Sequence, residues 1–188
     1  MIDPHKITNY SRNQNELEEF LIFCTLVPNK PALRTAQVLE NLLSSISKNI
    51  SPFDKIRYLL KNNQLLSALQ KFKTGQYSRI AKCLTQLANS NLNLKTCSTT
   101  DLEYVFGIGP KTSRFFLLHS RKNQKIAVLD THILKFLRQE MKISNVPKST
   151  PSKNRYRELE SIFLSIAEKQ SKSVADLDLE IWSKYSSQ

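Results

Sequence analysis

A lysine amine and an aspartate carboxylate, placed 19 residues apart, are the side chains of this sequence best suited to perform covalent chemistry together. Lys111 follows a Gly-Ile-Gly-Pro segment, and Asp130 follows an apolar Ala-Val-Leu run. A neutral amine attacks electron-poor carbon and forms Schiff bases, and a nearby carboxylate stabilises the positive charge that develops. The spacing equals about one helix and a returning connector, so the two side chains can face one another across a cleft.

Gly107 and Gly109 indicate a tight hairpin between two helices. Glycines at this spacing let the chain turn sharply and let its backbone come close to a ligand. Pro110 then begins a new helix, whose first turn offers free N–H groups and the positive end of the helix dipole to a phosphate. Taken alone, such a hairpin can equally be a plain turn between two packed helices.

Each of the two candidate catalytic residues also has a simpler explanation. Lys111 lies in the first turn of the new helix, where the dipole disfavours a second positive charge and favours the neutral amine. A lysine at this position can equally contact a phosphate or be merely solvated. Asp130 precedes an amphipathic stretch and can be the N-cap of a helix. The two residues become informative only when they are taken together.

The charge balance favours a polyanionic partner. The chain carries 28 lysines and arginines against 16 acidic residues, which leaves a formal net charge of +12 at pH 7. A charge this positive most often indicates nucleic acid, because every phosphate contact releases counterions. A protein that is merely basic would carry the same charge, so the charge supports nucleic-acid binding without deciding it.

The sequence predicts an intracellular protein without a membrane span. It holds no run of about 18 apolar residues, and residues 1–15 lack an apolar secretory core. Cys24, Cys83 and Cys97 lie far apart, which predicts free thiols in a reducing compartment. Because no Cys-x-x-Cys pair is present, neither a zinc site nor an iron–sulfur site is expected.

Helical periodicity dominates the sequence and predicts an all-α fold of roughly nine or ten helices. Pro52 after Ser51 is typical of a capped helix start, and Leu33 is expected on the buried face of the second helix. Residues 125–129 could be locally extended, and residues 145–154, with two prolines, are the best loop candidate. The helices are expected at residues 16–27, 31–43, 52–60, 63–72, 77–88, 100–106, 110–119, 131–141, 155–169 and 174–185.

Two segments together resemble the signature of the endonuclease III and 8-oxoguanine glycosylase superfamily, the helix-hairpin-helix DNA glycosylases. They are Phe106-Gly-Ile-Gly-Pro-Lys-Thr112 and Val128-Leu-Asp-Thr-His-Ile133. In this superfamily a lysine at the position of Lys111 marks enzymes that both excise a base and cleave the strand, and an aspartate at the position of Asp130 accompanies it. The resemblance therefore implies a Schiff-base nucleophile, Lys111, with Asp130 as its carboxylate partner.

The resemblance also implies which residues would contact the DNA. The hairpin residues Gly107, Gly109 and Thr112 would lie against its backbone. Residues 21–29 are similar to the helix and turn that, in these enzymes, fill the gap left by an extruded base. This makes Asn29 a wedge candidate, although the same residue could be a plain turn residue.

Residues 177–182 look like the C-terminal helix of the small archaeal and bacterial 8-oxoguanine glycosylases. That helix helps to form their base pocket, so Asp178 and Trp182 become pocket candidates, together with Tyr77 and Phe23. A lone tryptophan in a helical pattern is otherwise usually a core residue.

The family architecture implies two helical lobes with a cleft between them for the flipped nucleotide. Residues 16–122 would form a six-helix barrel with the hairpin, and residues 1–15 plus 123–188 would form the second lobe. The expected partner of this monomer is double-stranded DNA that contains a damaged base. No cofactor is expected, although a hydrated monovalent cation at the hairpin carbonyls would fit the family.

The excised base is expected to be 8-oxoguanine, because residues 177–182 resemble the small 8-oxoguanine glycosylases and because the chain lacks the four-cysteine cluster of endonuclease III. Three alternatives stay open. The protein could excise oxidised pyrimidines, it could act only as a lyase on abasic sites, or it could bind DNA through the hairpin without catalysis. The last alternative requires neither Lys111 nor Asp130, so their joint presence counts against it.

The basic charge predicts a steep dependence of DNA affinity on salt. If about four phosphates are engaged, the logarithm of the association constant for duplex DNA should fall against the logarithm of salt concentration with a slope of about −3.6. Fluorescence anisotropy of a labelled duplex between low and physiological ionic strength measures this slope. A flat profile would contradict binding through phosphates.

Overall fold

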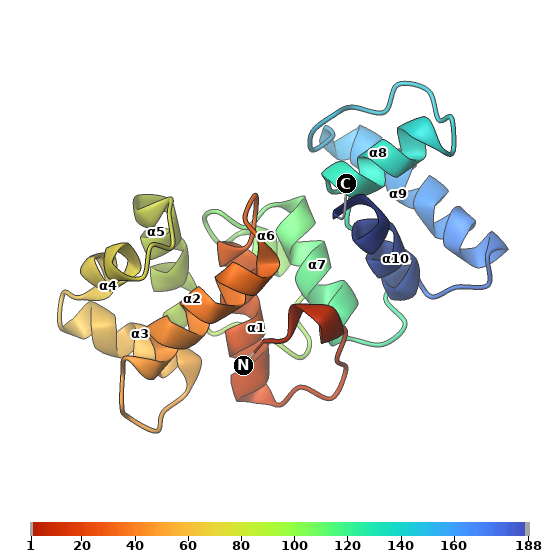
Figure 1. Cartoon of the computed structure of the whole chain (residues 1–188). Coiled ribbons are helices and arrows are strands. Elements are labelled where there is room, and N and C mark those ends of the chain that lie inside the picture. Colours follow the sequence, from red (N-terminus) through yellow and green to blue (C-terminus); the bar gives the residue numbers. More distant parts are fainter. Residues whose placement is uncertain (1, 187–188) are drawn as a thin grey trace.

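The computed structural model describes residues 2–186, and the regular structure of these residues is entirely helical (Figure 1). This confirms the all-α fold; residues 125–129 lie in an irregular connector. Met1, Ser187 and Gln188, which the sequence analysis assigned to the second lobe, lie outside the described residues. In chain order the elements are η1 (Pro4–Lys6), α1 (Gln14–Leu26), α2 (Ala32–Ser44), α3 (Pro52–Lys61), α4 (Leu65–Lys71), α5 (Tyr77–Ala88), α6 (Thr99–Glu103), α7 (Pro110–Ser120), α8 (Thr131–Gln139), α9 (Lys153–Lys169) and α10 (Val174–Ser186).

The buried apolar side chains gather in two main clusters, which correspond to the two groups of helices in Figure 1. The larger cluster is formed by α1–α7 together with Ile2 and Ile7 on either side of η1, and the smaller one by α8–α10 and the connector before α8. A third, small cluster of Leu118, Val128 and Ala175 lies where α7, the connector and α10 meet. The helices therefore form two lobes that share an apolar contact at the end of α7.

The N-terminal segment differs from its expected place in the second lobe. Ile2 and Ile7 are buried in the larger cluster, and the Arg12 guanidinium lies 4.0 Å above the ring of Phe20 on α1. The same guanidinium donates to the carbonyl of His119 at the end of α7. Residues 2–12 thus pack across α1 and α7, because their few apolar side chains find the larger core within reach.

Most helix starts follow from local sequence. Ser51 caps α3 and Pro52 occupies its first turn, as predicted. Asn13 and Glu16 form a capping box that starts α1 two residues before the expected position. Leu33 departs from the prediction, since it is 60% exposed. It lies in the first turn of α2, off the face along which α2 is buried.

None of the helices in residues 2–186 combines the length and the apolarity that a membrane crossing requires.

Two serines offer a matched test of capping. Ser98 caps α6 in a capping box with Asp101, whereas Ser152 stands at the N-cap of α9 without a side-chain hydrogen bond to the helix. Ser98→Ala should lower the free energy of unfolding by about 1 kcal/mol, because it leaves a first-turn N–H without its acceptor. Ser152→Ala should stay within about 0.3 kcal/mol of the wild type, because no such bond is lost. Urea unfolding followed by circular dichroism measures both, and equal effects would contradict this reading.

Candidate active site

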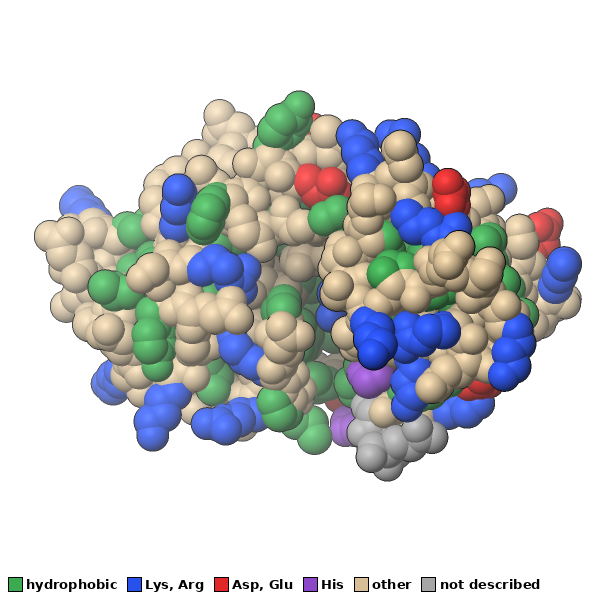
Figure 2. All heavy atoms as spheres, turned by 90° about the horizontal axis from the view of Figure 1, so that it is seen from above, with side chains coloured by type: hydrophobic (Ala, Val, Ile, Leu, Met, Phe, Trp, Pro, Cys, Tyr) green, Lys and Arg blue, Asp and Glu red, His purple; other side chains and the backbone are tan. Residues whose placement is uncertain are grey.

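A pocket of about 330 Å³ lies where the two lobes meet. Its walls come from the N-terminal segment, from α1 and the turn after it, from the first half of α7, from the first turn of α8, and from α10. Lys111 and Asp130 both line it. The surface view in Figure 2 shows Lys and Arg side chains on both sides of the hollow between the lobes. A polyanion that approached this hollow would therefore meet positive charge on either side.

Lys111 and Asp130 face one another across this pocket. The Lys111 Nζ atom lies 3.9 Å from Asp130 Oδ2, and the two side chains are 37% and 12% exposed. Asp130 Oδ1 accepts hydrogen bonds from the backbone N–H groups of His132 and Ile133, both at 2.9 Å. Asp130 is thus both the N-cap of α8 and the partner of the lysine. One carboxylate oxygen holds the helix, and the other is directed at the amine.

The hairpin places Lys111 in the first turn of α7. Gly107 has a φ of +85°, and a Cβ atom there would lie 3.2 Å from Arg79 Nη1. Gly109 is the N-cap of α7 and makes no side-chain cap, and a Cβ atom at Gly109 would meet nothing within 4 Å. The first-turn N–H groups of α7 are therefore left without a side-chain cap, as a phosphate site requires.

One of the hairpin carbonyls, at which a monovalent cation was expected, already has a positively charged neighbour. The Gly107 carbonyl accepts a hydrogen bond from Arg79 Nη1 at 3.0 Å, so a positive charge already lies against it. A second cation at this carbonyl would be repelled at short range. Among residues 2–186, no group of three or more His, Cys, Asp or Glu side chains could hold a metal ion.

Asp178 and His119 form a buried pair in the wall of the pocket. The Asp178 carboxylate is 5% exposed and lies 3.2 Å from His119 Nε2, and His119 Nδ1 lies 2.8 Å from Thr8 Oγ1. Burial raises the pKa of the Asp178 carboxyl, and the hydrogen bond to His119 opposes part of this rise. Sequence reasoning identified Asp178 and missed His119. A signal was present, because Lys111, Phe115 and His119 follow one another at four-residue spacing on one face of α7.

The remaining predicted site residues are only partly brought together. Phe23, which is buried, and Trp182, which is 37% exposed, both line the pocket. Asn29 lies exposed at the pocket with a φ of +60°, which is compatible with both a wedge and a turn residue. Thr112 is buried and forms part of the pocket wall, so its side chain does not face outward from the hairpin. Tyr77 was wrongly placed, because it packs against the larger core at the start of α5 and does not line the pocket.

Cys24 also lines the pocket, at the base of its α1 wall. This thiol is 1% exposed, and burial raises its pKa well above the usual range. Cys83 and Cys97 are likewise free and buried, and burial raises the pKa of each. The expectation of free thiols is therefore confirmed for all three cysteines.

Two helical lobes, with a glycine hairpin that brings a lysine amine to a carboxylate in the pocket between them, define the helix-hairpin-helix DNA glycosylase fold. A family model described as 8-oxoguanine DNA glycosylase matches residues 2–172. The chain belongs to this family.

Known proteins resemble the chain over nearly its whole length. It is 30% identical over 195 residues to an 8-oxoguanine DNA glycosylase/AP lyase from Saccharolobus islandicus. The matched region covers 97% of this chain and 88% of the relative. The solved structure of the Methanocaldococcus jannaschii 8-oxoguanine glycosylase/lyase, in complex with DNA containing 8-oxoguanine, matches with a TM-score of 0.74 and 22% identity over 98% of this chain and 87% of that one. The 8-oxoguanine DNA glycosylase of Thermotoga maritima matches with a TM-score of 0.71 and 21% identity, at the same coverage.

Substitutions of the two hairpin glycines distinguish backbone strain in the free protein from steric hindrance of DNA binding. Gly109→Ala should leave the free energy of unfolding within about 0.5 kcal/mol of the wild type, because its Cβ atom enters open space. The same substitution should weaken duplex binding about tenfold, because the Cβ atom would occupy the approach of a phosphate. Gly107→Ala should cost about 1 kcal/mol or more of stability, since its φ is positive.

Urea unfolding and fluorescence anisotropy with a labelled duplex measure the two effects separately. Wild-type affinity in the Gly109→Ala protein would show that the hairpin backbone does not approach DNA closely.

Proposed function

We propose that this protein is a bifunctional 8-oxoguanine DNA glycosylase/AP lyase in which Lys111 is the nucleophile. The observation that carries the proposal is the approach of the Lys111 amine to Asp130 Oδ2, at 3.9 Å, inside the pocket between the lobes. The family to which the chain belongs supports the same activity. A protein that only bound DNA through its hairpin would need neither side chain.

The chemistry begins when the damaged nucleotide leaves the helix stack and enters the pocket, at a cost of a few kcal/mol. The neutral Lys111 amine attacks C1′ of the sugar, the N-glycosidic bond breaks, and the base departs with its bonding electrons and takes up a proton. The sugar ring then opens, and C1′ becomes the carbon of a Schiff base with Lys111. Asp130 stabilises the positive charge that develops on the sugar and holds the amine in place.

Strand cleavage follows from the same intermediate. The cationic Schiff base makes the C2′ protons acidic, so loss of one proton is followed by expulsion of the 3′ phosphate. The C3′–O bond breaks and the strand is cut on the 3′ side of the lesion. These steps transfer no electrons to or from an external acceptor, so they require no redox cofactor.

The composition of the pocket supports a flat aromatic substrate. Phe23, Phe115 and Trp182 offer apolar surface, and Asp178 offers a buried polar group in the same wall. A pocket of about 330 Å³ is in the size range of sites for small ligands. Aromatic surface next to a buried polar group suits a base that must be both stacked and hydrogen-bonded.

The wider properties of the chain agree with work on duplex DNA inside the cell. The net charge of +12 supports phosphate contacts, and the buried free thiols suit a reducing compartment. Both candidate catalytic residues come from one chain, so a monomer is sufficient for activity.

A panel of duplexes with single lesions tests the substrate. 8-Oxoguanine should be released fastest among 8-oxoguanine, thymine glycol and uracil, and a duplex with an abasic site should be nicked as well. Much faster release of thymine glycol would place the protein among enzymes for oxidised pyrimidines. Nicking of the abasic duplex without release of any base would make it a lyase alone.

Substitution of the candidate pair tests the mechanism. Borohydride should trap the wild-type protein covalently on substrate DNA by reducing the Schiff base, and Lys111→Gln should abolish trapping while DNA binding remains. Asp130→Asn should slow base release about 10²-fold, in line with the loss of one well-placed electrostatic group. Its fold should persist, because asparagine also caps helices. Undiminished trapping by the Lys111→Gln protein would show that another amine is the nucleophile.

A further inference from the structure

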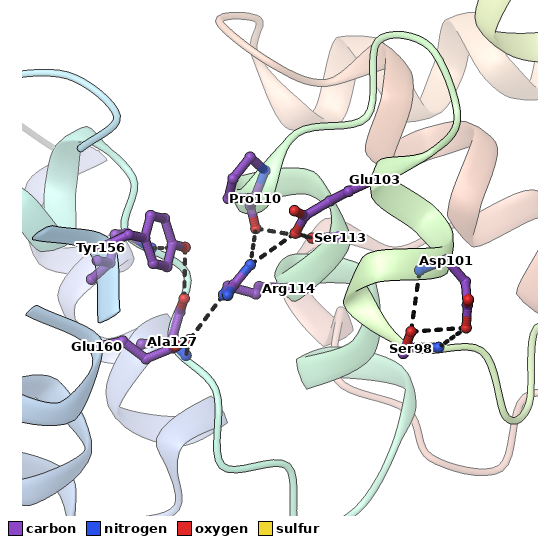
Figure 3. Close-up of polar contacts among 10 residues, drawn as sticks. Ser98, Asp101, Glu103, Pro110, Ser113, Arg114, Ala127, Tyr156 and Glu160 are labelled. Carbon is purple, nitrogen blue, oxygen red and sulfur yellow. Dashed lines mark hydrogen bonds and ion pairs between the residues drawn. The ribbon is translucent and has the colours of Figure 1, made fainter. Parts of the chain in front are cut away.

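Arg114 lies three residues after Lys111 on α7 and connects the two lobes outside the pocket (Figure 3). Its Nε atom lies 2.9 Å from Glu160 Oε1 on α9, and its Nη1 atom lies 2.9 Å from Glu103 Oε1 on α6. The guanidinium carbon is 4.5 Å from the centre of the Tyr156 ring. Only 15% of the arginine side chain is exposed, so this is a largely desolvated ion pair between lobes.

The partners of Arg114 in the second lobe hold the connector that carries Asp130. Glu160 Oε1 also accepts a hydrogen bond from the backbone N–H of Ala127, at 2.9 Å. The Tyr156 hydroxyl donates to the Ala127 carbonyl at 2.8 Å and accepts from the N–H of Leu129 at 3.0 Å. This connector is irregular, so its backbone groups lack the regular hydrogen bonds of a helix or sheet. Glu160 and Tyr156 provide hydrogen bonds to these groups just before Asp130.

The partners of Arg114 in the first lobe hold the hairpin that carries Lys111. Glu103, at the end of α6, accepts a hydrogen bond from Ser113 Oγ at 2.7 Å as well as one from Arg114. Ser113 Oγ also lies 3.1 Å from the Pro110 carbonyl. The helix before the hairpin and the first turn after it are thus held together by one carboxylate.

We propose that Arg114 is a positioning residue that sets the distance between the Lys111 amine and the Asp130 carboxylate. Its guanidinium is bonded at once to the carboxylate that holds the hairpin and to the carboxylate that holds the connector. Arg114 does not line the pocket, so it acts through these neighbours and does not touch the substrate. The inference rests on the proposed function, since it assigns a role in the same reaction.

Kinetics under single-turnover conditions separates positioning from binding. Glu160→Gln keeps the shape and leaves Arg114 paired with Glu103, and Arg114→Met removes the link between the lobes. Both should lower the rate constant of base release at saturating enzyme by about 10²-fold, because a misplacement of about 1 Å has this effect. The dissociation constant for duplex DNA should change less than about threefold, because Arg114 is largely buried and outside the pocket.

A conservative variant of Arg114 and a control variant on α9 complete the kinetic experiment. Arg114→Lys keeps one charge and should recover part of the lost rate, to within about tenfold of the wild type. Glu158→Gln lies on the same helix, but Glu158 is exposed and pairs only with Arg155 among the ion pairs of the described residues. This control should behave as the wild type.

A merely structural role for Arg114 predicts a different outcome. The variants would then show a lower melting temperature and a smaller burst amplitude, while the rate constant per active site stayed unchanged. That result for Glu160→Gln and Arg114→Lys would overturn the proposal, even if Arg114→Met failed to fold.

A second measurement does not depend on activity. Reductive methylation with ¹³C-formaldehyde labels the lysines, and the resonance of Lys111, assigned by its loss in Lys111→Gln, reports its carboxylate neighbour. In Arg114→Lys and Glu160→Gln it should move toward its position in Asp130→Asn. If the wild type released no base, the proposed function would be wrong. The chemical shift of Lys111 would still test whether Arg114 positions Lys111 against Asp130. An unmoved Lys111 resonance in both variants would overturn the positioning role.

Discussion

Helix α7 makes a contact between ionisable side chains with each helix of the second lobe, and the geometry of the site depends on these three contacts. Lys111 faces Asp130 at the start of α8, Arg114 binds Glu160 on α9, and His119 meets Asp178 on α10. The His119–Asp178 pair is almost fully removed from solvent, and the side chains of Arg114 and Glu160 are 15% and 14% exposed. Buried pairs of this kind add little net stability, because desolvation offsets their attraction. Their effect is to fix how the two lobes meet, since any other docking would leave a buried polar group without a partner.

Asp130 shows that a structural and a chemical role need not compete. A carboxylate has two oxygens, and capping the α8 helix engages only Oδ1. The cap orients the side chain so that Oδ2 is held toward the amine without a separate supporting group. The hairpin likewise combines a structural and a binding role. Because no side chain caps the first turn of α7, its N–H groups remain available to an anion. In both places the end of a helix provides the site.

The sequence predicted what local rules control and missed what depends on distant contacts. The helix periodicity, the Ser51 cap and the pairing of Lys111 with Asp130 are visible within short segments. His119 and Arg114 were not found, because their partners lie 59 and 46 residues away along the chain. Tyr77 was misplaced for the same reason, since packing against the larger core, and not the local sequence, decides that α5 lies away from the pocket. The N-terminal segment was assigned to the wrong lobe because a polar stretch with two buried isoleucines does not indicate which core will accept them.

The burial of the three cysteines has a consequence for a protein that works where oxidants damage DNA. Oxidation proceeds through the thiolate, and burial keeps Cys24, Cys83 and Cys97 in the protonated form. The thiol of Cys24, in the wall of the pocket, is therefore a poor target for peroxide and a poor competitor for an opened sugar aldehyde. The same oxidative burst that creates the lesion would therefore spare these three thiols, and with them the part of the pocket wall that Cys24 forms.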